Sequence, residues 1–223
     1  MTWLRHALVI VAKDLRREAR ARDFAVATIV LALLMLLTFA FAFDVAGEHV
    51  RRAAPGILWA TVLFAGMIVA GRTFAAEEER GTLEGLLLAP VDRGAIYLGK
   101  FLGMLVTMTA LEALVLPAYA AFFGVPALAL GVLGSVAAGT VGFAAAATLF
   151  GAVATHARAR EVLLPLLLLP AASPLVIAGV RATDVALGGP AVGADMPWLQ
   201  LIVGGGVLYL AVALAVIDYV LEY

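Results

Sequence analysis

Six long apolar segments, joined by shorter polar ones, run along the 223 residues of the chain. They occupy residues 24–43, 53–75, 95–123, 126–155, 161–180 and 198–220. A helix rises about 1.5 Å per residue, so about 20 residues are enough to cross the roughly 30 Å hydrocarbon core of a bilayer. None of the segments shows the alternation of apolar and polar residues that is typical of barrel strands. The pattern predicts an all-α integral membrane protein with six transmembrane helices in a single domain, 1–223.

The first 22 residues have a different pattern. Leu4, Leu8, Val11 and Leu15 follow one another at spacings of four, three and four, which places them on one face of a helix. Basic residues surround that face, and such a helix lies on a membrane surface with its cations near anionic lipid. We therefore expect an N-terminal amphipathic interfacial helix over 1–22. The alternative is a basic tail that only sets the topology.

A polar insert, residues 72–100, separates the second and third apolar segments and is more elaborate than a turn. Gly81 interrupts the helix that leaves the second span, and Pro90 ends the short stretch after it. Between them, leucines at 83, 86 and 87 share one helical face. We expect a short helical element over 77–90 that docks a soluble partner. Its candidate contact residues are Glu78, Glu79, Thr82 as N-cap, Leu83, Glu84 and Leu87. The alternative is a surface helix that rests its leucines on its own bundle.

The chain turns back into a membrane span after this insert, and Asp92 can cap the helix that begins near Ala95. The fifth apolar segment contains Pro165, Pro170 and Pro174, which should kink it. The next residues, 181–197, are rich in Gly, Pro and Asp. They are expected to form a loop or a short re-entrant structure on the outer face.

Composition and charge set the orientation. The chain is 64% hydrophobic with a mean hydropathy of +1.06, which is a membrane composition. With the N-terminus inside, all of its 15 Lys and Arg residues lie on the inner side except Arg51, Arg52 and Arg181. Both termini should therefore be cytoplasmic. A net charge of −1 argues against nucleic acid as a partner, and the lack of cysteine excludes thiol chemistry by this chain.

Three further features carry candidate chemistry. Glu112 is the one acidic residue deep within a span, and it is either a proton or substrate site or a buried structural contact. His49, beside Arg51 and Arg52, could bind haem through its iron and propionates, or it is a solvated loop residue. Residues 94–100 match the G-x-x-x-x-G-K spacing of a phosphate loop. Phe101 stands next in place of Ser or Thr, so we expect no nucleotide there.

The order of these parts resembles that of a type-2 ABC exporter permease, and residues 78–90 and 96–100 resemble the signature of that group, here EERGTLEGLLLAP and IYLGK. Two other stretches are similar to CcmB, the haem exporter B family of cytochrome c maturation. They are RAAPGILW at 52–59 and the Leu/Pro-rich REVLLPLLLLP at 160–170. The resemblance covers nearly the whole chain.

The resemblance implies a non-catalytic permease subunit in the bacterial inner membrane, with 77–90 as the coupling helix for an ATPase. Its partners would be a CcmA-like ATPase that holds ATP–Mg, CcmC-like and CcmD-like membrane proteins, the haem chaperone CcmE and a second copy of the chain. The complex would handle haem, through haem export or through release of the haem-loaded chaperone. The alternatives are another type-2 ABC exporter, for lipid, polysaccharide or drug, and a proton-coupled carrier that uses Glu112.

Overall fold

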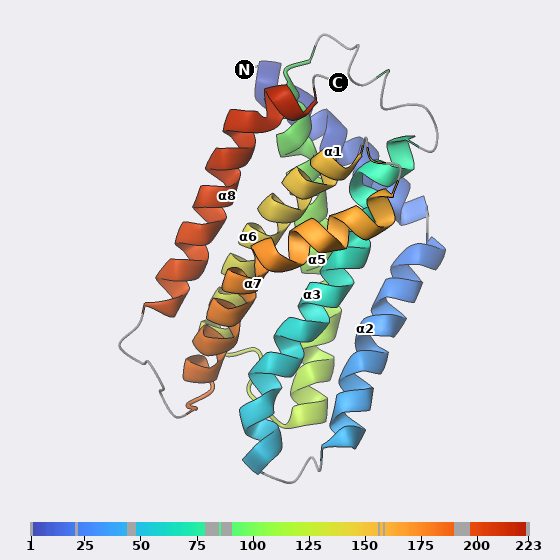
Figure 1. The fold of residues 1–223 in the computed structure, drawn as a ribbon. Coiled ribbons are helices and arrows are strands. Elements are labelled where there is room, and N and C mark those ends of the chain that lie inside the picture. The colour runs from blue at the N-terminus through green and yellow to red at the C-terminus, as the bar shows by residue number, and fades with distance from the viewer. Residues whose placement is uncertain are drawn as a thin grey trace.

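A computed structural model of the chain describes residues 2–20, 22–43, 48–78, 85, 91–155, 157, 159–189 and 197–221 (Figure 1). Every regular element in these ranges is a helix, so the all-α prediction is confirmed. Six of the helices are long and apolar enough to cross a membrane. The helices are α1 (Thr2–Arg20), α2 (Arg22–Ala42), α3 (Glu48–Glu78), α5 (Arg93–Phe123), α6 (Leu130–Ala154), α7 (Arg160–Ala186) and α8 (Trp198–Val220).

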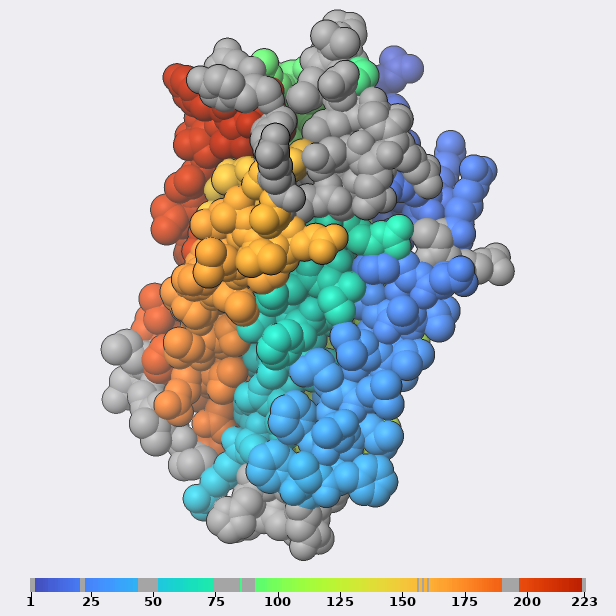
Figure 2. Space-filling model, turned by 45° about the vertical axis from the view of Figure 1, so that its right-hand side comes forward, coloured from blue at the N-terminus to red at the C-terminus, as the bar shows by residue number. Residues whose placement is uncertain are grey.

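The six long helices form one bundle, and α1 lies at the end of the bundle where both termini are found (Figure 1). We call this end the terminal end. Helix α6 is the most enclosed, with 72% of an 18-residue apolar stretch buried, whereas the corresponding stretches of α2 and α8 are only 22% buried. From one side, α3 is visible between α2 and α7 (Figure 2). The peripheral helices therefore leave wide apolar faces for lipid.

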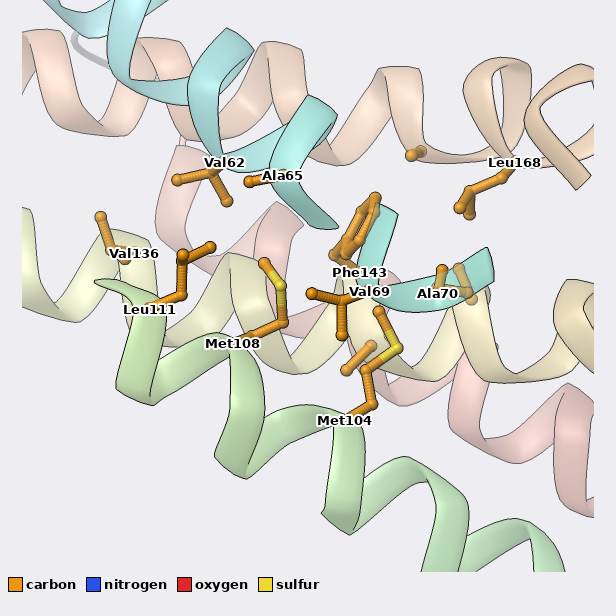
Figure 3. Close-up of a cluster of buried hydrophobic side chains, with 14 of the residues drawn as sticks. Val62, Ala65, Val69, Ala70, Met104, Met108, Leu111, Val136, Phe143 and Leu168 are labelled. Atoms are coloured by element: carbon orange, nitrogen blue, oxygen red, sulfur yellow. The ribbon is translucent and has the colours of Figure 1, made fainter. Parts of the chain in front are cut away.

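The core lies where α3, α5 and α6 meet. Met104 and Met108 of α5 point toward Val69 of α3 and Phe143 of α6 (Figure 3). The Phe143 ring reaches the backbone of α3 because Gly66 has no side chain: a Cβ there would lie 2.4 Å from Cε1 of the ring. Flexible methionines beside a fixed aromatic ring fill an irregular space between helices.

Small residues bring the other helices together. Trp59 of α3 inserts between Gly139 of α6 and Gly179 of α7, where a Cβ would lie 2.0 Å and 2.4 Å from the indole ring. Its Nε1 donates a hydrogen bond of 2.9 Å to Oγ1 of Thr183. Between membrane helices the attraction comes from close packing and hydrogen bonds, since lipid is as apolar as the side chains. The tryptophan therefore fixes the arrangement of three helices at once.

Helix α7 is longer than the predicted span 161–180, because it continues through Arg181 to Ala186. Its prolines do not end it. Pro174 lacks an N–H for the carbonyl of Pro170, and the hydroxyl of Ser173 donates to that oxygen instead, at 2.8 Å. The first part of the predicted outer loop is thus helical, and residues 190–196 lie outside the described residues.

The fourth span also differs from its predicted range, 126–155. Gly124 ends α5 in the left-handed conformation, with φ of 59°, and its N–H bonds to the carbonyl of Ala120. Residues 125–129 then turn, and α6 begins only at Leu130. Hydropathy alone did not mark this turn, because its residues are as apolar as those of the helix.

Candidate functional site

The predicted coupling residues lie mostly outside the described residues. Glu78 is the last residue of α3, but the structure does not describe its side chain, and Glu79, Thr82, Leu83, Glu84 and Leu87 fall in the undescribed part. Within 79–90 the structure describes only Gly85, which is helical and exposed. The two flanks are described, and both lie at the terminal end of the bundle (Figure 1).

The flank after the insert is fixed by side chains. Asp92 caps α5 as predicted, since its Oδ1 accepts from the N–H of Ala95 at 3.3 Å. The same oxygen accepts from Nε1 of Trp3 on α1, at 3.1 Å. The guanidinium of Arg93 donates to the carbonyl oxygen of Asp218 near the end of α8, at 2.6 Å. The first turn of α5 is therefore bonded to both α1 and α8.

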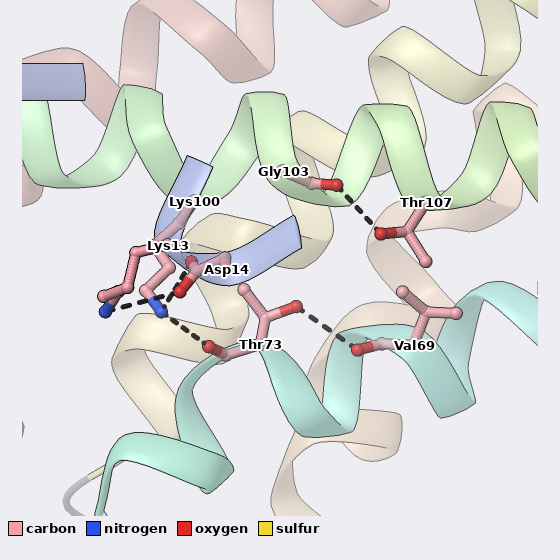
Figure 4. Close-up of polar contacts among 7 residues, drawn as sticks. All are labelled: Lys13, Asp14, Val69, Thr73, Lys100, Gly103 and Thr107. Atoms are coloured by element: carbon pink, nitrogen blue, oxygen red, sulfur yellow. Dashed lines mark hydrogen bonds and ion pairs between the residues drawn. The ribbon is translucent and has the colours of Figure 1, made fainter. Parts of the chain in front are cut away.

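About two turns further along α5, a buried lysine joins three helices (Figure 4). The Nζ of Lys100 lies 3.0 Å from Oδ2 of Asp14 on α1 and donates to the carbonyl of Thr73 on α3, at 3.1 Å. Its side chain is fully buried, whereas that of Asp14 is 18% exposed. Lys13 approaches the other carboxylate oxygen, at 3.3 Å. We call Lys100, Asp14 and Thr73 the lysine node.

Sequence reasoning missed the lysine node as a site. Lys100 was considered only as the last residue of the motif at 96–100. Asp14, which lies among the basic residues of α1, was not singled out. A signal was present, because the buried Ala7 and Ile10 and the partly buried Asp14 recur at helical spacing on one face of α1. The apolar face predicted for this helix is a different one, and its residues Leu4 and Leu8 are more than half exposed.

Helix α1 reaches the node because α5 presents a glycine to it. A Cβ on Gly99 would lie 2.7 Å from Cβ of Ile10 and 3.0 Å from the carbonyl oxygen of Ala7. Such an approach is open only to glycine. The helix that carries Asp14 is thereby held against the start of α5.

The string at residues 94–100 is not a phosphate loop. All seven residues belong to the continuous helix α5, and the amine of Lys100 is engaged in the lysine node. A phosphate loop needs consecutive backbone N–H groups that are turned toward the anion, and a helix uses them internally.

Glu112 lies in the middle of α5 and is 5% exposed. Its Oε1 lies 2.5 Å from the hydroxyl of Thr140 on α6, which donates to it. The hydroxyl also lies 2.9 Å from the carbonyl of Val136. The carboxyl group thus makes a polar contact between two helices of the core, which is where acidic residues within spans are usually found.

The haem-binding candidates at the start of α3 lie mostly outside the described side chains. His49 and Arg51 belong to the first turns of α3, at the end of the bundle opposite the termini, and their side chains are not described. Arg52 is exposed. Among the described residues, no group of three or more His, Cys, Asp or Glu side chains is arranged to hold a metal ion.

Comparison with known proteins gives a consistent result. The family model described as "CcmB protein" matches residues 5–219. A protein named "Heme exporter protein B" from Rhodobacter capsulatus is 30% identical over 173 residues, which are 77% of this chain and 79% of the relative. Its namesake from Paracoccus denitrificans is 30% identical over 175 residues, 78% of this chain and 80% of the relative.

Proposed function

The chain belongs to the CcmB family, and from this premise we propose that it is the membrane permease subunit of an ATP-driven haem exporter complex. In this role it couples ATP hydrolysis on another subunit to haem export or to release of a haem-loaded chaperone. The chain itself carries no catalytic step. Family membership favours this role over that of an exporter for lipid, polysaccharide or drug, and over a proton-coupled carrier.

The position of the two helix ends that flank segment 79–90 is the observation that carries the proposal. The segment joins the end of α3 directly to the start of α5, and both helices then run the length of the bundle (Figure 1). The carboxylates Glu78, Glu79 and Glu84 would face basic residues of the ATPase, while Thr82, Leu83 and Leu87 form and seat the coupling helix.

The bonds around the start of α5 support transmission of a push from this segment. Asp92, Arg93 and Lys100 bond α5 to α1, α8 and α3 within its first turns. A force on the segment would therefore move these helices together, since packed helices shift as rigid elements. Helix α5 would carry the movement 31 residues along the bundle to Phe123.

The other components follow from the family. We propose a CcmA-like ATPase with ATP–Mg, CcmC-like and CcmD-like membrane proteins, a CcmE-like haem chaperone and a second copy of this chain. The complex lies in the bacterial inner membrane, with both termini cytoplasmic. Haem is handled by the complex, and we assign no haem ligand in this chain.

Charge reversal tests the coupling segment. Replacing Glu78, Glu79 and Glu84 together by Lys should weaken co-purification of the ATPase by roughly tenfold or more, because like charges would then meet across the interface. The measurement is the ratio of ATPase to permease after affinity purification of the tagged permease.

A matched triple reversal, Asp23→Lys, Glu161→Lys and Asp218→Lys, changes the same number of charges on exposed residues at the same end of the bundle. It should leave the ATPase ratio near that of the parent chain. An ATPase that stays bound and coupled to the first triple variant would show that segment 79–90 is not the coupling element.

A further inference from the structure

A groove of about 270 Å³ opens on the side of the bundle between α1, α2 and α5. Small residues make the space: Ala25 of α2 and Ala110 of α5 line it where larger side chains would fill it. Leu15 closes it toward α1, and Val69 of α3 forms part of its wall. Its volume is close to the lower limit of about 300 Å³ for small-molecule sites.

The walls of the groove are apolar except at Glu18 on its α1 side. Thr28 and Thr107 both line it, but each donates its hydroxyl to its own helix, to the carbonyls of Phe24 and Gly103, both at 3.0 Å. Their methyl groups are left for the groove. Leu114, further along, is 53% exposed. Since α2 and α5 are both membrane spans, the groove faces the hydrocarbon of the bilayer.

The other end of the groove is cationic. A second cavity of about 50 Å³ shares part of its lining and reaches the lysine node. Arg17 and Arg72 line it, and the guanidinium of Arg72 lies 4.0 Å from the ring centroid of Phe24. Lys100 there is matched by Asp14, and Glu18 offsets one of the two arginines. The charged residues of this lining therefore sum to one positive charge, at the end of the apolar groove.

We propose that this groove binds an anionic glycerophospholipid. One acyl chain lies between α2 and α5, and the phosphate lies beside Arg17 and Arg72. The arrangement matches an amphipathic ligand, because the apolar part opens to the bilayer and the cationic part lies at the terminal end, where the headgroups are. A soluble anion would use only the small cavity and leave the larger groove unfilled.

The lipid would contact the same helix that carries Asp14 and would hold α1 against the bundle. This site does not depend on the coupling role of segment 79–90. Lipid retention and ATPase co-purification are measured separately, so either proposal can fail without the other.

Native mass spectrometry of the full chain in detergent tests the site. The probe is phosphatidylglycerol, compared with phosphatidylcholine of the same acyl chains. We expect one phosphatidylglycerol to be retained in preference to phosphatidylcholine. Arg17→Gln and Arg72→Gln should each weaken retention roughly fivefold, as expected for loss of one cation near an anionic headgroup.

Two substitutions fill the groove from opposite walls. Ala110→Phe and Ala25→Leu should each abolish retention of phosphatidylglycerol. If both variants lose the lipid, misfolding of one variant cannot explain the result. The matched controls are Arg16→Gln, an exposed cation of α1 outside the lining, and Ala211→Phe, an exposed alanine on α8. Both controls should retain the lipid like the parent chain.

Three results would overturn the proposal. The first is equal retention of the two phospholipids. The second is equal loss in the groove variants and their controls. The third is displacement of phosphatidylglycerol by inorganic phosphate alone, which would reveal an anion site without a place for the acyl chain.

Discussion

The side chain of Lys100 has no exposed surface, and the two groups that hold it come from different helices. A buried ammonium group is tolerated only when its charge is matched and its N–H groups are bonded. Asp14 matches the charge, and the carbonyl of Thr73 takes a hydrogen bond. At this scale, one buried side chain helps to hold α1 on the bundle, together with the Trp3–Asp92 hydrogen bond and the close approach at Gly99.

Lys100→Met should therefore lower the free energy of unfolding by about 3 kcal/mol. This is the lower end of the range for breaking a buried ion pair, because Lys13 stays beside the partly exposed Asp14. A thermal shift assay in detergent measures the loss. The double variant Lys100→Met with Asp14→Leu should recover part of it, since no carboxylate is then left without its partner.

Lys13→Met is the matched control, because Lys13 approaches the same carboxylate with a side chain that is 48% exposed. An exposed pair contributes less than about 1 kcal/mol. Equal losses at the two lysines would contradict the importance of burial at the lysine node.

At the scale of elements, glycine positions determine which helices can approach closely. Trp59 of α3 fits between α6 and α7 only because Gly139 and Gly179 have no side chains. Gly142 of α6 and Gly206 of α8 meet backbone to backbone, since a Cβ on Gly142 would lie 3.3 Å from Cα of Gly206. Close backbone approach is a main source of attraction between membrane helices.

Two glycines of α6 should therefore respond to alanine with opposite signs. Gly139→Ala places a methyl group 2.0 Å from Cη2 of Trp59 and should destabilise the chain by about 1–3 kcal/mol, as overpacking does. Gly134→Ala meets nothing within 4 Å and should stabilise it by up to about 1 kcal/mol through helix propensity. Thermal shifts in detergent compare the two. A stabilised Gly139→Ala variant would contradict the packing of Trp59 against α6.

At the scale of the whole molecule, the helices place both termini and the ends of α3 and α5 that flank segment 79–90 at one end, and the α5–α6 turn at the other (Figure 1). The charge distribution predicts that the terminal end lies on the cytoplasmic side. Since the chain has no cysteine, a single introduced thiol reports the side of the membrane on which it lies.

Leu128→Cys, in the α5–α6 turn, should react with a membrane-impermeant maleimide in intact spheroplasts. Arg16→Cys, on α1, should react only after lysis. Both parent residues are exposed, so accessibility within the fold does not separate them. The reverse labelling pattern would place the termini outside and exclude a cytoplasmic ATPase at segment 79–90.

Much of the fold could be predicted from the sequence. The six spans follow from the apolar runs, because a backbone in lipid must bond to itself and a helix does so locally. The cap at Asp92 was also local, since it lies three residues from the N–H that it binds. The limits of α6 and α7 were less predictable, because hydropathy does not distinguish an apolar turn from a helix, and a kinked helix can continue past its prolines.

The candidate site was only partly predictable. Glu112 was identified as a polar group inside a span, but its partner Thr140 lies on another helix. Lys100 and Asp14 were present in the sequence without any sign that they meet. The coupling residues between Glu79 and Leu87 stay a prediction, because that part of the chain lies outside the described residues.

The sequence by itself determined the membrane class, the number of spans and the local start of α5, since these depend on the length of apolar runs and on near neighbours in the chain. Only the tertiary structure decided which helix faces meet. It paired Trp59 with Thr183, 124 residues away, buried Lys100 beside Asp14 and left the groove between α2 and α5. These features depend on shape and charge at positions far apart in the chain, and they take form only when the helices pack together.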